Sequence, residues 1–182
     1  IETSQRLAGA GAELRKELIS SVEKVLNFVA ALPPETDNIF SWKGDKKILK
    51  GKDLKIILTL SDDPIFQAAT LAPGGKSPET DGLTYLGYRP KDKTYAMGTM
   101  LIVDRIYFDE KMQPRKDVTT RLITVLAHEL YGNVQNILST EIEKFQGMTL
   151  AARKEAEVKS FEASIAYLER LQKSAIYDKL DK

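Results

Sequence analysis

One stretch of this sequence, residues 120–139 (TRLITVLAHELYGNVQNILS), constrains the fold more than any other. Its apolar residues recur at spacings of three and four, which is typical of a helix with one buried face. They are Leu122, Val125, Leu126 and Leu130. The only histidine of the chain, His128, lies within this pattern and is followed at once by Glu129. A buried carboxylate is costly unless it is paired or functional. The pair therefore predicts either a hydrogen-bonded core histidine or a site that uses both groups.

Composition limits the class of protein. With 182 residues, 42% hydrophobic and 29% charged, the chain matches an ordinary globular protein, and we expect residues 1–182 to form a single domain. The 27 basic and 26 acidic residues nearly cancel, so no nucleic-acid partner is expected. The absence of cysteine excludes disulfides and thiolate chemistry, and it slightly favours an exported bacterial protein.

The chain also lacks the sequence features of a membrane or targeting segment. No apolar run approaches the length of a membrane span, and no signal peptide is visible. The first residue is Ile1 rather than methionine, so we expect a mature, truncated or excised piece of a longer protein. The oligomeric state cannot be read from these features.

The N-terminal third predicts one helix followed by strands. The helix runs from about Glu2 to Leu32 and ends at two prolines. We expect its apolar stripe to pack on the domain's own core rather than on a partner; the stripe consists of Leu14, Leu18, Val22, Val25 and Val29. Strands are predicted over residues 38–42, 53–60, 85–88, 94–97 and 100–108.

The last of these strands is apolar on both faces, which predicts a position between two layers. Residues 61–92 are rich in Pro and Gly and predict loops that could line a cleft. A helix is expected to begin at Asp117 or Thr119 and to reach at least residue 139. Thr149 is expected to cap a second long helix, over about residues 150–171.

The His-Glu pair is the opening of the zinc-protease motif His-Glu-x-x-His, but the place of the second histidine is taken by Gly132. The sequence from His128 to Asn133 instead resembles the His-Glu-x-x-Gly-His motif of the dipeptidyl peptidase III family, with Asn133 in place of the second histidine. Five residues advance a regular helix about 140° away from the first ligand. Both positions can face one metal only where the helix widens, as at a π-bulge, and Gly132 suits such a distortion.

This resemblance implies a third metal ligand, a glutamate on the following helix. Residues 155–161 resemble the glutamate helix of thermolysin-like zinc peptidases, and that likeness selects Glu155 as the ligand, with Glu157 and then Glu162 in reserve. We expect the buried face of the helix to be made of Val158, Phe161, Ile165 and Leu168. Tyr131 and Tyr167 are possible donors to a transition-state oxyanion, although core or surface roles are more usual.

Together these features predict an α+β, zincin-like (gluzincin) fold: an N-terminal helix, a small twisted mixed sheet, an active-site helix and a glutamate-bearing helix. The implied function is a zinc metallopeptidase whose substrate is a peptide or protein. Zinc would be held by His128, Asn133 and Glu155, and Glu129 would activate the zinc-bound water. Because an amide is a poor zinc ligand, we expect the chain as written to bind zinc weakly or not at all and to be impaired or inactive.

Three explanations of Asn133 remain open: an engineered replacement of histidine, a natural pseudoenzyme that kept the fold, or an accidental likeness. The alternative function is a catalytically silent binding module, or an exported effector domain, that engages a protein partner. Metal content separates these alternatives from a working peptidase, because a binding module need not hold a metal ion.

Overall fold

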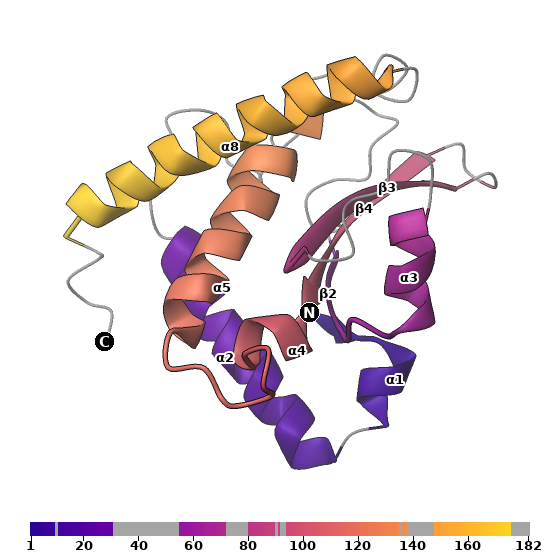
Figure 1. The fold of residues 1–182 in the computed structure, drawn as a ribbon, viewed down its shortest axis with the longest axis vertical. Helices are drawn as coiled ribbons and strands as arrows, with labels where there is room; N and C mark the ends of the chain where they lie inside the picture. Colours follow the sequence, from indigo (N-terminus) through magenta and orange to yellow (C-terminus); the bar gives the residue numbers. More distant parts are fainter. Residues whose placement is uncertain are drawn as a thin grey trace.

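The fold is seen in a computed structural model that describes residues 1–9, 11–30, 55–71, 80–89, 91, 94–134, 136–137 and 148–175. These residues form helices around a four-stranded mixed sheet, so the predicted α+β class is confirmed (Figure 1). In chain order the elements are β1 (Glu2–Thr3), α1 (Gln5–Ala8), α2 (Ala12–Ala30), β2 (Lys55–Thr59), α3 (Pro64–Leu71), β3 (Gly82–Arg89), β4 (Thr94–Ile102), α4 (Val103–Tyr107), α5 (Val118–Leu126), η2 (Ala127–Val134) and α8 (Leu150–Lys173).

The strands of the sheet follow the order β1-β2-β4-β3. The pairs β1–β2 and β2–β4 are parallel, whereas β3 and β4 are antiparallel, with Leu83 opposite Met100. The expected strands at 53–60, 85–88 and 94–97 are therefore confirmed as β2, β3 and β4, and the expected strand at 38–42 lies outside the described residues. As a result β3 is the last strand of the sheet on the side where the candidate site lies.

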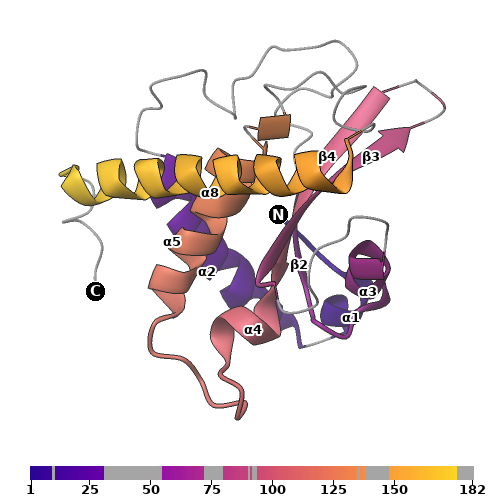
Figure 2. The ribbon, with the colours of Figure 1, turned by 45° about the horizontal axis from the view of Figure 1, so that its top comes forward.

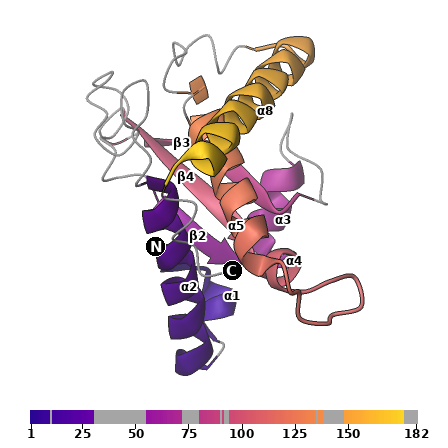
Figure 3. The ribbon, with the colours of Figure 1, turned by 90° about the vertical axis from the view of Figure 1, so that its left-hand side faces the viewer.

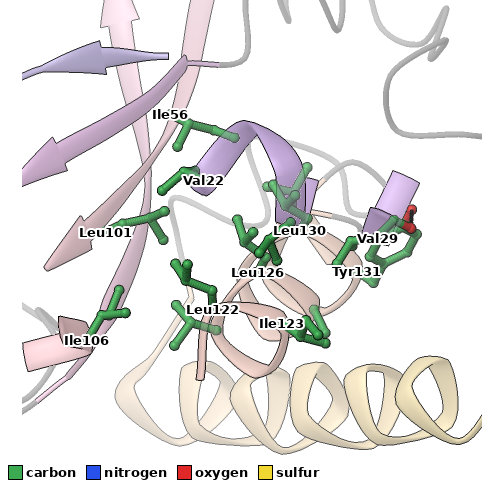
Figure 4. Packing of buried hydrophobic residues seen from close by; sticks show 14 of the residues in the cluster. Val22, Val29, Ile56, Leu101, Ile106, Leu122, Ile123, Leu126, Leu130 and Tyr131 are labelled. Atoms are coloured by element: carbon green, nitrogen blue, oxygen red, sulfur yellow. Dashed lines mark hydrogen bonds between the residues drawn. The ribbon is translucent and has the colours of Figure 1, made fainter. Parts of the chain in front are cut away.

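The two faces of the sheet bury different sets of side chains. Ile56, Leu58 and Leu101 belong to the main core with α2, α5, η2 and α8, and Figure 4 shows part of this packing. Neighbouring residues along the same strands point the other way and pack with Phe66 of α3. Figures 1 and 2 show α2 and α3 on opposite sides of the sheet. The alternation places the long helices on the face where the larger core lies.

The N-terminal segment is less continuous than predicted. Instead of one helix from Glu2 to Leu32, it forms β1, the short helix α1 and then α2. The hydroxyl of Ser4 accepts a hydrogen bond from the backbone N–H of Leu7 and so starts α1 as an N-cap. Along α2 the predicted stripe is buried except at its first member, because Leu14 is 50% exposed.

The strand predicted over residues 100–108 is correct only as far as Ile102. β4 ends at Ile102, and the chain continues as the helix α4. Val103 and Ile106 are buried and lie three residues apart, so they share one face of the helix, whereas in a strand they would point to opposite faces. Asp104 accepts hydrogen bonds from the backbone and hydroxyl of Ser61, and these bonds hold the turn against the end of β2. Likewise the loop-rich region 61–92 contains α3 and β3.

Candidate functional site

The helix that carries His128 changes its winding at the predicted place. Val118–Leu126 is α-helical, and the next eight residues, Ala127–Val134, form a π-helix. A π-helix has a wider turn, in which residues five apart lie over one another. His128 and Asn133 therefore share one face, and the Nδ2 atom of Asn133 lies 3.3 Å from the Nε2 atom of His128. The local widening expected from the five-residue spacing is confirmed.

Asn133 also holds the carboxylate of Glu129. Its Nδ2 atom donates to Oε2 of Glu129 at 3.0 Å, and the hydroxyl of Thr84 on β3 donates to the same oxygen at 2.7 Å. Glu129 is only 1% exposed, so these donors offset part of the cost of burying its charge. Because the carboxylate can only accept, the nitrogen of the Asn133 side chain must face it. Asn133 thus serves as a donor here.

The glutamate next to His128 is Glu157. Its Oε1 atom lies 3.2 Å from Nε2 of His128, and its side chain is 35% exposed. Glu155, which the sequence selected first, lies on the outer side of α8, where its side chain is 69% exposed and forms an ion pair with Lys159 at 2.9 Å. Glu162 is also exposed. The structure therefore brings together His128, Asn133 and the reserve residue Glu157, but neither Glu155 nor Glu162.

Glu157 rather than Glu155 lies beside His128 because of the way α8 is rotated about its own axis. The predicted buried face was wrong: Val158, Phe161 and Ile165 are 56%, 51% and 54% exposed, and Leu168 is only partly buried. The residues that α8 buries are Ser160, Ser164, Tyr167 and Leu171. Small serines face η2, so the two helices approach closely; Figure 3 shows α8 crossing the α5–η2 helix. This rotation turns Glu157 toward His128.

Gly132 is the residue that permits this crossing. A Cβ atom at Gly132 would lie 2.5 Å from the backbone carbonyl oxygen of Ser160, which is too close for any side chain. Asn136 adds a polar contact at the same crossing, since its Nδ2 atom donates to the carbonyl oxygen of Ala156 at 3.2 Å. The sequence predicts that Gly132 eases the distortion of the helix, and the structure gives it a second role, in helix–helix contact.

Three residues of the site were missed in the sequence. Thr84 lies on β3, where its hydroxyl reaches Glu129, and Gly82 leaves room for that side chain, because a Cβ there would lie 2.9 Å from Cγ of Glu129. The ring of Phe161 stacks on His128 with centroids 4.2 Å apart. Thr84 and Gly82 follow no periodic signal, and the apolar spacing on α8 predicts a core position for Phe161 rather than a position beside His128.

Tyr131 and Tyr167 lie in the core. Their rings stack with centroids 3.9 Å apart, and both hydroxyls donate to the carbonyl oxygen of Val29 in the last turn of α2. Burial raises the pKa of both phenols. Both hydroxyl protons are donated inside the core, so these tyrosines have the core role, and the structure does not position them as donors to a transition-state oxyanion.

The donors present fit a zinc ion only in part. His128 Nε2 and Glu157 Oε1 are suitable ligands and face each other, but Asn133 presents its N–H to this position rather than a lone pair. Within the described ranges no three His, Cys, Asp or Glu side chains group closely enough to hold a metal ion. Nδ1 of His128 is buried and has no hydrogen-bond partner among the described residues. Among the described residues, position 133 lies close enough to Nε2 of His128 for a third strong ligand to stand there.

The comparisons with known proteins add no further identification. No protein-family model, no curated protein and no solved structure matches this chain. Among the described helices, none is both long and apolar enough to cross a lipid bilayer. The function is therefore inferred from the geometry of the site itself.

Proposed function

We propose that this chain is a zincin-like metallopeptidase domain whose metal position is incomplete as written. The observation that carries the proposal is the π-helix, which brings His128, Glu129 and position 133 together at the spacing of the His-Glu-x-x-Gly-His motif. A regular α-helix would turn His128 and Asn133 about 140° apart, and the wider turn has a cost that a function would justify.

Each side chain then has a role. His128 and Glu157 would hold the metal, and when bound, zinc would polarise a water molecule. Glu129 would accept the proton of that water, since its carboxylate lies beside position 133 and is oriented by Thr84. Asn133 fills the remaining ligand position with a weak donor for zinc. We therefore expect the chain as written to have little or no hydrolytic activity.

A change of Asn133 tests the metal site. Asn133→His should raise the zinc content toward one ion per chain, measured by elemental analysis after dialysis, because two ligands are already in place. In that background Glu157→Gln should lose the zinc. Glu155→Gln is the matched control, since Glu155 lies two residues away on the same helix but faces solvent, and it should keep the zinc. No gain of zinc on Asn133→His, in a folded protein, rejects the ligand assignment.

A change of Glu129 tests the chemistry separately. In the Asn133→His background, Glu129→Gln should keep zinc but reduce peptide hydrolysis by about 10²- to 10⁴-fold, the usual contribution of a general base. The amide preserves the shape of the side chain and can still accept from Thr84. Unchanged turnover would remove Glu129 from the mechanism while leaving the metal site intact.

One observation favours a second function, a catalytically silent binding module. In the structure Asn133 donates to Glu129 and thereby satisfies the carboxylate without any metal. Such an arrangement is stable by itself and suits a domain that retains the fold for recognition. The two functions predict different results for Asn133→His. If the chain derives from a working peptidase, the variant gains zinc and turnover, whereas a binding module that never held zinc gains neither.

A further inference from the structure

The outer face of α8 carries a stripe of exposed apolar side chains. Val158, Phe161 and Ile165 are spaced by three and four residues, so they lie along one side of the helix, and each is more than half exposed. Single apolar residues on a surface are ordinary, but a row of them on one helix face usually marks an interaction site. We call these three residues the α8 stripe.

The α8 stripe is continuous with the candidate site. The ring of Phe161 stacks on His128 with an interplanar angle of 25°. Glu157, four residues before Phe161 and therefore on the neighbouring turn, contacts the same histidine. A molecule lying along the stripe would therefore reach the His128 side chain at one border.

The other border of the stripe is acidic. Glu155, Glu162 and Glu169 recur every seven residues and so share one edge of the helix. Glu155 is paired with Lys159, whereas Glu162 and Glu169 are exposed next to Phe161 and Ile165. Glu157 lies on the opposite border beside Val158 and Phe161, and the exposed Lys154 precedes Val158 by one turn. The part of the stripe from Phe161 to Ile165 therefore has carboxylates along one edge, and these favour a cationic partner.

From these contacts we infer that the α8 stripe binds a peptide segment that carries apolar side chains flanked by Lys or Arg. The inference rests on the proposed function in that this peptide would be the substrate of the adjacent site. From Val158 to Ile165 the stripe is about 10 Å long, which matches about three residues of an extended chain.

Two other occupants fit less well. A helix that binds a membrane surface usually has basic flanks facing anionic lipids, whereas the edge of this stripe that carries Glu162 and Glu169 is acidic. A second copy of the chain packed stripe to stripe would bring glutamates of both copies together, and like charges destabilise such a contact.

The test is peptide binding to the full chain in EDTA, followed by fluorescence anisotropy. The probe is a fluorescein-labelled Lys-Ala-Leu-Phe-Ala-Lys peptide. Its two matched peptides replace either both lysines by glutamate or the Leu-Phe pair by Ser-Ser. Phe161→Ser should weaken binding of the probe about five- to tenfold, because the half-exposed ring loses its contact area. Ile65→Ser is the control, since Ile65 is 47% exposed on α3, on the other face of the sheet.

The charge of the edge is tested separately. Glu162→Lys should weaken binding of the probe peptide by up to about fivefold at low salt and by less at high salt, because exposed ion pairs are weak and are screened by salt. Glu110→Lys, at an exposed position away from α8, should change nothing. Equal binding of all three peptides, or equal loss in Phe161→Ser and Ile65→Ser, overturns the inference.

Three further outcomes have fixed meanings. Sedimentation of a dimer that Phe161→Ser dissociates would assign the stripe to a second copy and overturn the peptide partner. Stronger binding of the protein to anionic phosphatidylserine vesicles than to the probe would assign the α8 stripe to a membrane surface. That result would also overturn the peptide partner. Because the assay contains EDTA, a failure of Asn133→His to bind zinc would reject the metallopeptidase proposal while leaving the peptide result unaffected.

Discussion

Two ring stacks join the same pair of helices, η2 and α8, and they differ in almost everything except geometry. Tyr131 and Tyr167 stack at 3.9 Å with an interplanar angle of 13°, and His128 and Phe161 stack at 4.2 Å with an angle of 25°. The tyrosines are 7% and 3% exposed, whereas Phe161 is 51% exposed. One stack is part of the core, and the other lies where the core meets solvent.

The polar atoms explain what each stack is for. Both tyrosine hydroxyls donate to one carbonyl at the end of α2, a group that has no partner within its own helix. In the other stack, Nε2 of His128 lies between an amide donor and a carboxylate acceptor. A neutral ring nitrogen can satisfy one of these but not both. The tyrosine stack therefore satisfies its hydroxyl groups within the core, whereas Nε2 of His128 can form a good hydrogen bond with only one of its two neighbours.

The largest expected effect is on stability, at the tyrosine stack. Tyr167→Ala should lower the free energy of unfolding by about 3–5 kcal/mol, the usual loss for a buried aromatic side chain. Tyr167→Phe keeps the ring and should cost only about 0.5–1.5 kcal/mol, because Val29 still accepts from Tyr131. Urea denaturation followed by circular dichroism measures both. The contrast between the two stacks is wrong if Tyr167→Ala lowers the free energy of unfolding by no more than Phe161→Ala does.

The next effect is at the crossing that lies between the two stacks. Gly132→Ala should destabilise the protein by about 1–3 kcal/mol, since the added methyl group meets the backbone of Ser160. This loss exceeds the gain of up to about 1 kcal/mol that alanine normally brings to a helix. Gly11→Ala is the control, because a Cβ at Gly11 has no atom within 4 Å. Thermal melting of both variants should show a loss for the first only; equal melting temperatures would show that the crossing is loose.

A third effect follows from the pKa of the tyrosines. Burial raises the pKa of Tyr131 and Tyr167 above the ordinary value of 10.0, so the folded state keeps both protons more tightly than the unfolded state. The resulting stability is complete below pH 10.0 and is lost as the pH rises through the raised values. Tyrosinate absorbance should therefore appear together with loss of helix signal. Tyr167→Phe should lessen this alkaline loss; ionisation of these tyrosines at their ordinary pKa with intact helices would contradict it.

The smallest expected effect is at the exposed stack. Phe161→Ala should change the free energy of unfolding by less than about 0.5 kcal/mol, because half of the ring already faces solvent. The histidine should nevertheless respond, since it loses the ring that covers it. The chemical shift of the His128 ring protons measures this directly. A shift without a loss of stability sharpens the distinction between the two stacks, whereas a large loss of stability would place Phe161 in the core.

These contrasts show how far the sequence could predict the site. Local features were readable: the π-helix follows from the five-residue spacing of a single motif, and Thr149 caps α8 as expected, its hydroxyl accepting from the backbone of Ala152. Properties that depend on how two segments of the chain pack together could not be predicted from the sequence. The sheet could be expected but not its order, and the start of α4 within an apolar run looked like more strand.

The rotation of α8 is the clearest example. Apolar periodicity favoured Val158, Phe161 and Ile165 as the buried face, because it weighs only hydrophobicity. The structure instead buries the smaller Ser160 and Ser164, since a glycine on the facing helix makes close approach more favourable than a thick apolar contact. The available signal was Gly132 in one helix together with serines four residues apart in the next. A face of α8 that contains these serines also contains Glu157 rather than Glu155, so this signal predicts Glu157 beside His128.

The capping of α2 by the two tyrosines also determines when this fold can be completed. Val29 is separated by 102 residues from Tyr131 and by 138 residues from Tyr167. During synthesis α2 leaves the ribosome early, but the tyrosine hydroxyls that bind its last turn are synthesised much later. Contacts of such long range slow folding, because the intervening chain must be ordered before they form. A nascent chain stopped short of Tyr167 would hold α2 with an unfinished end, so this domain should become protease-resistant only once α8 has been made.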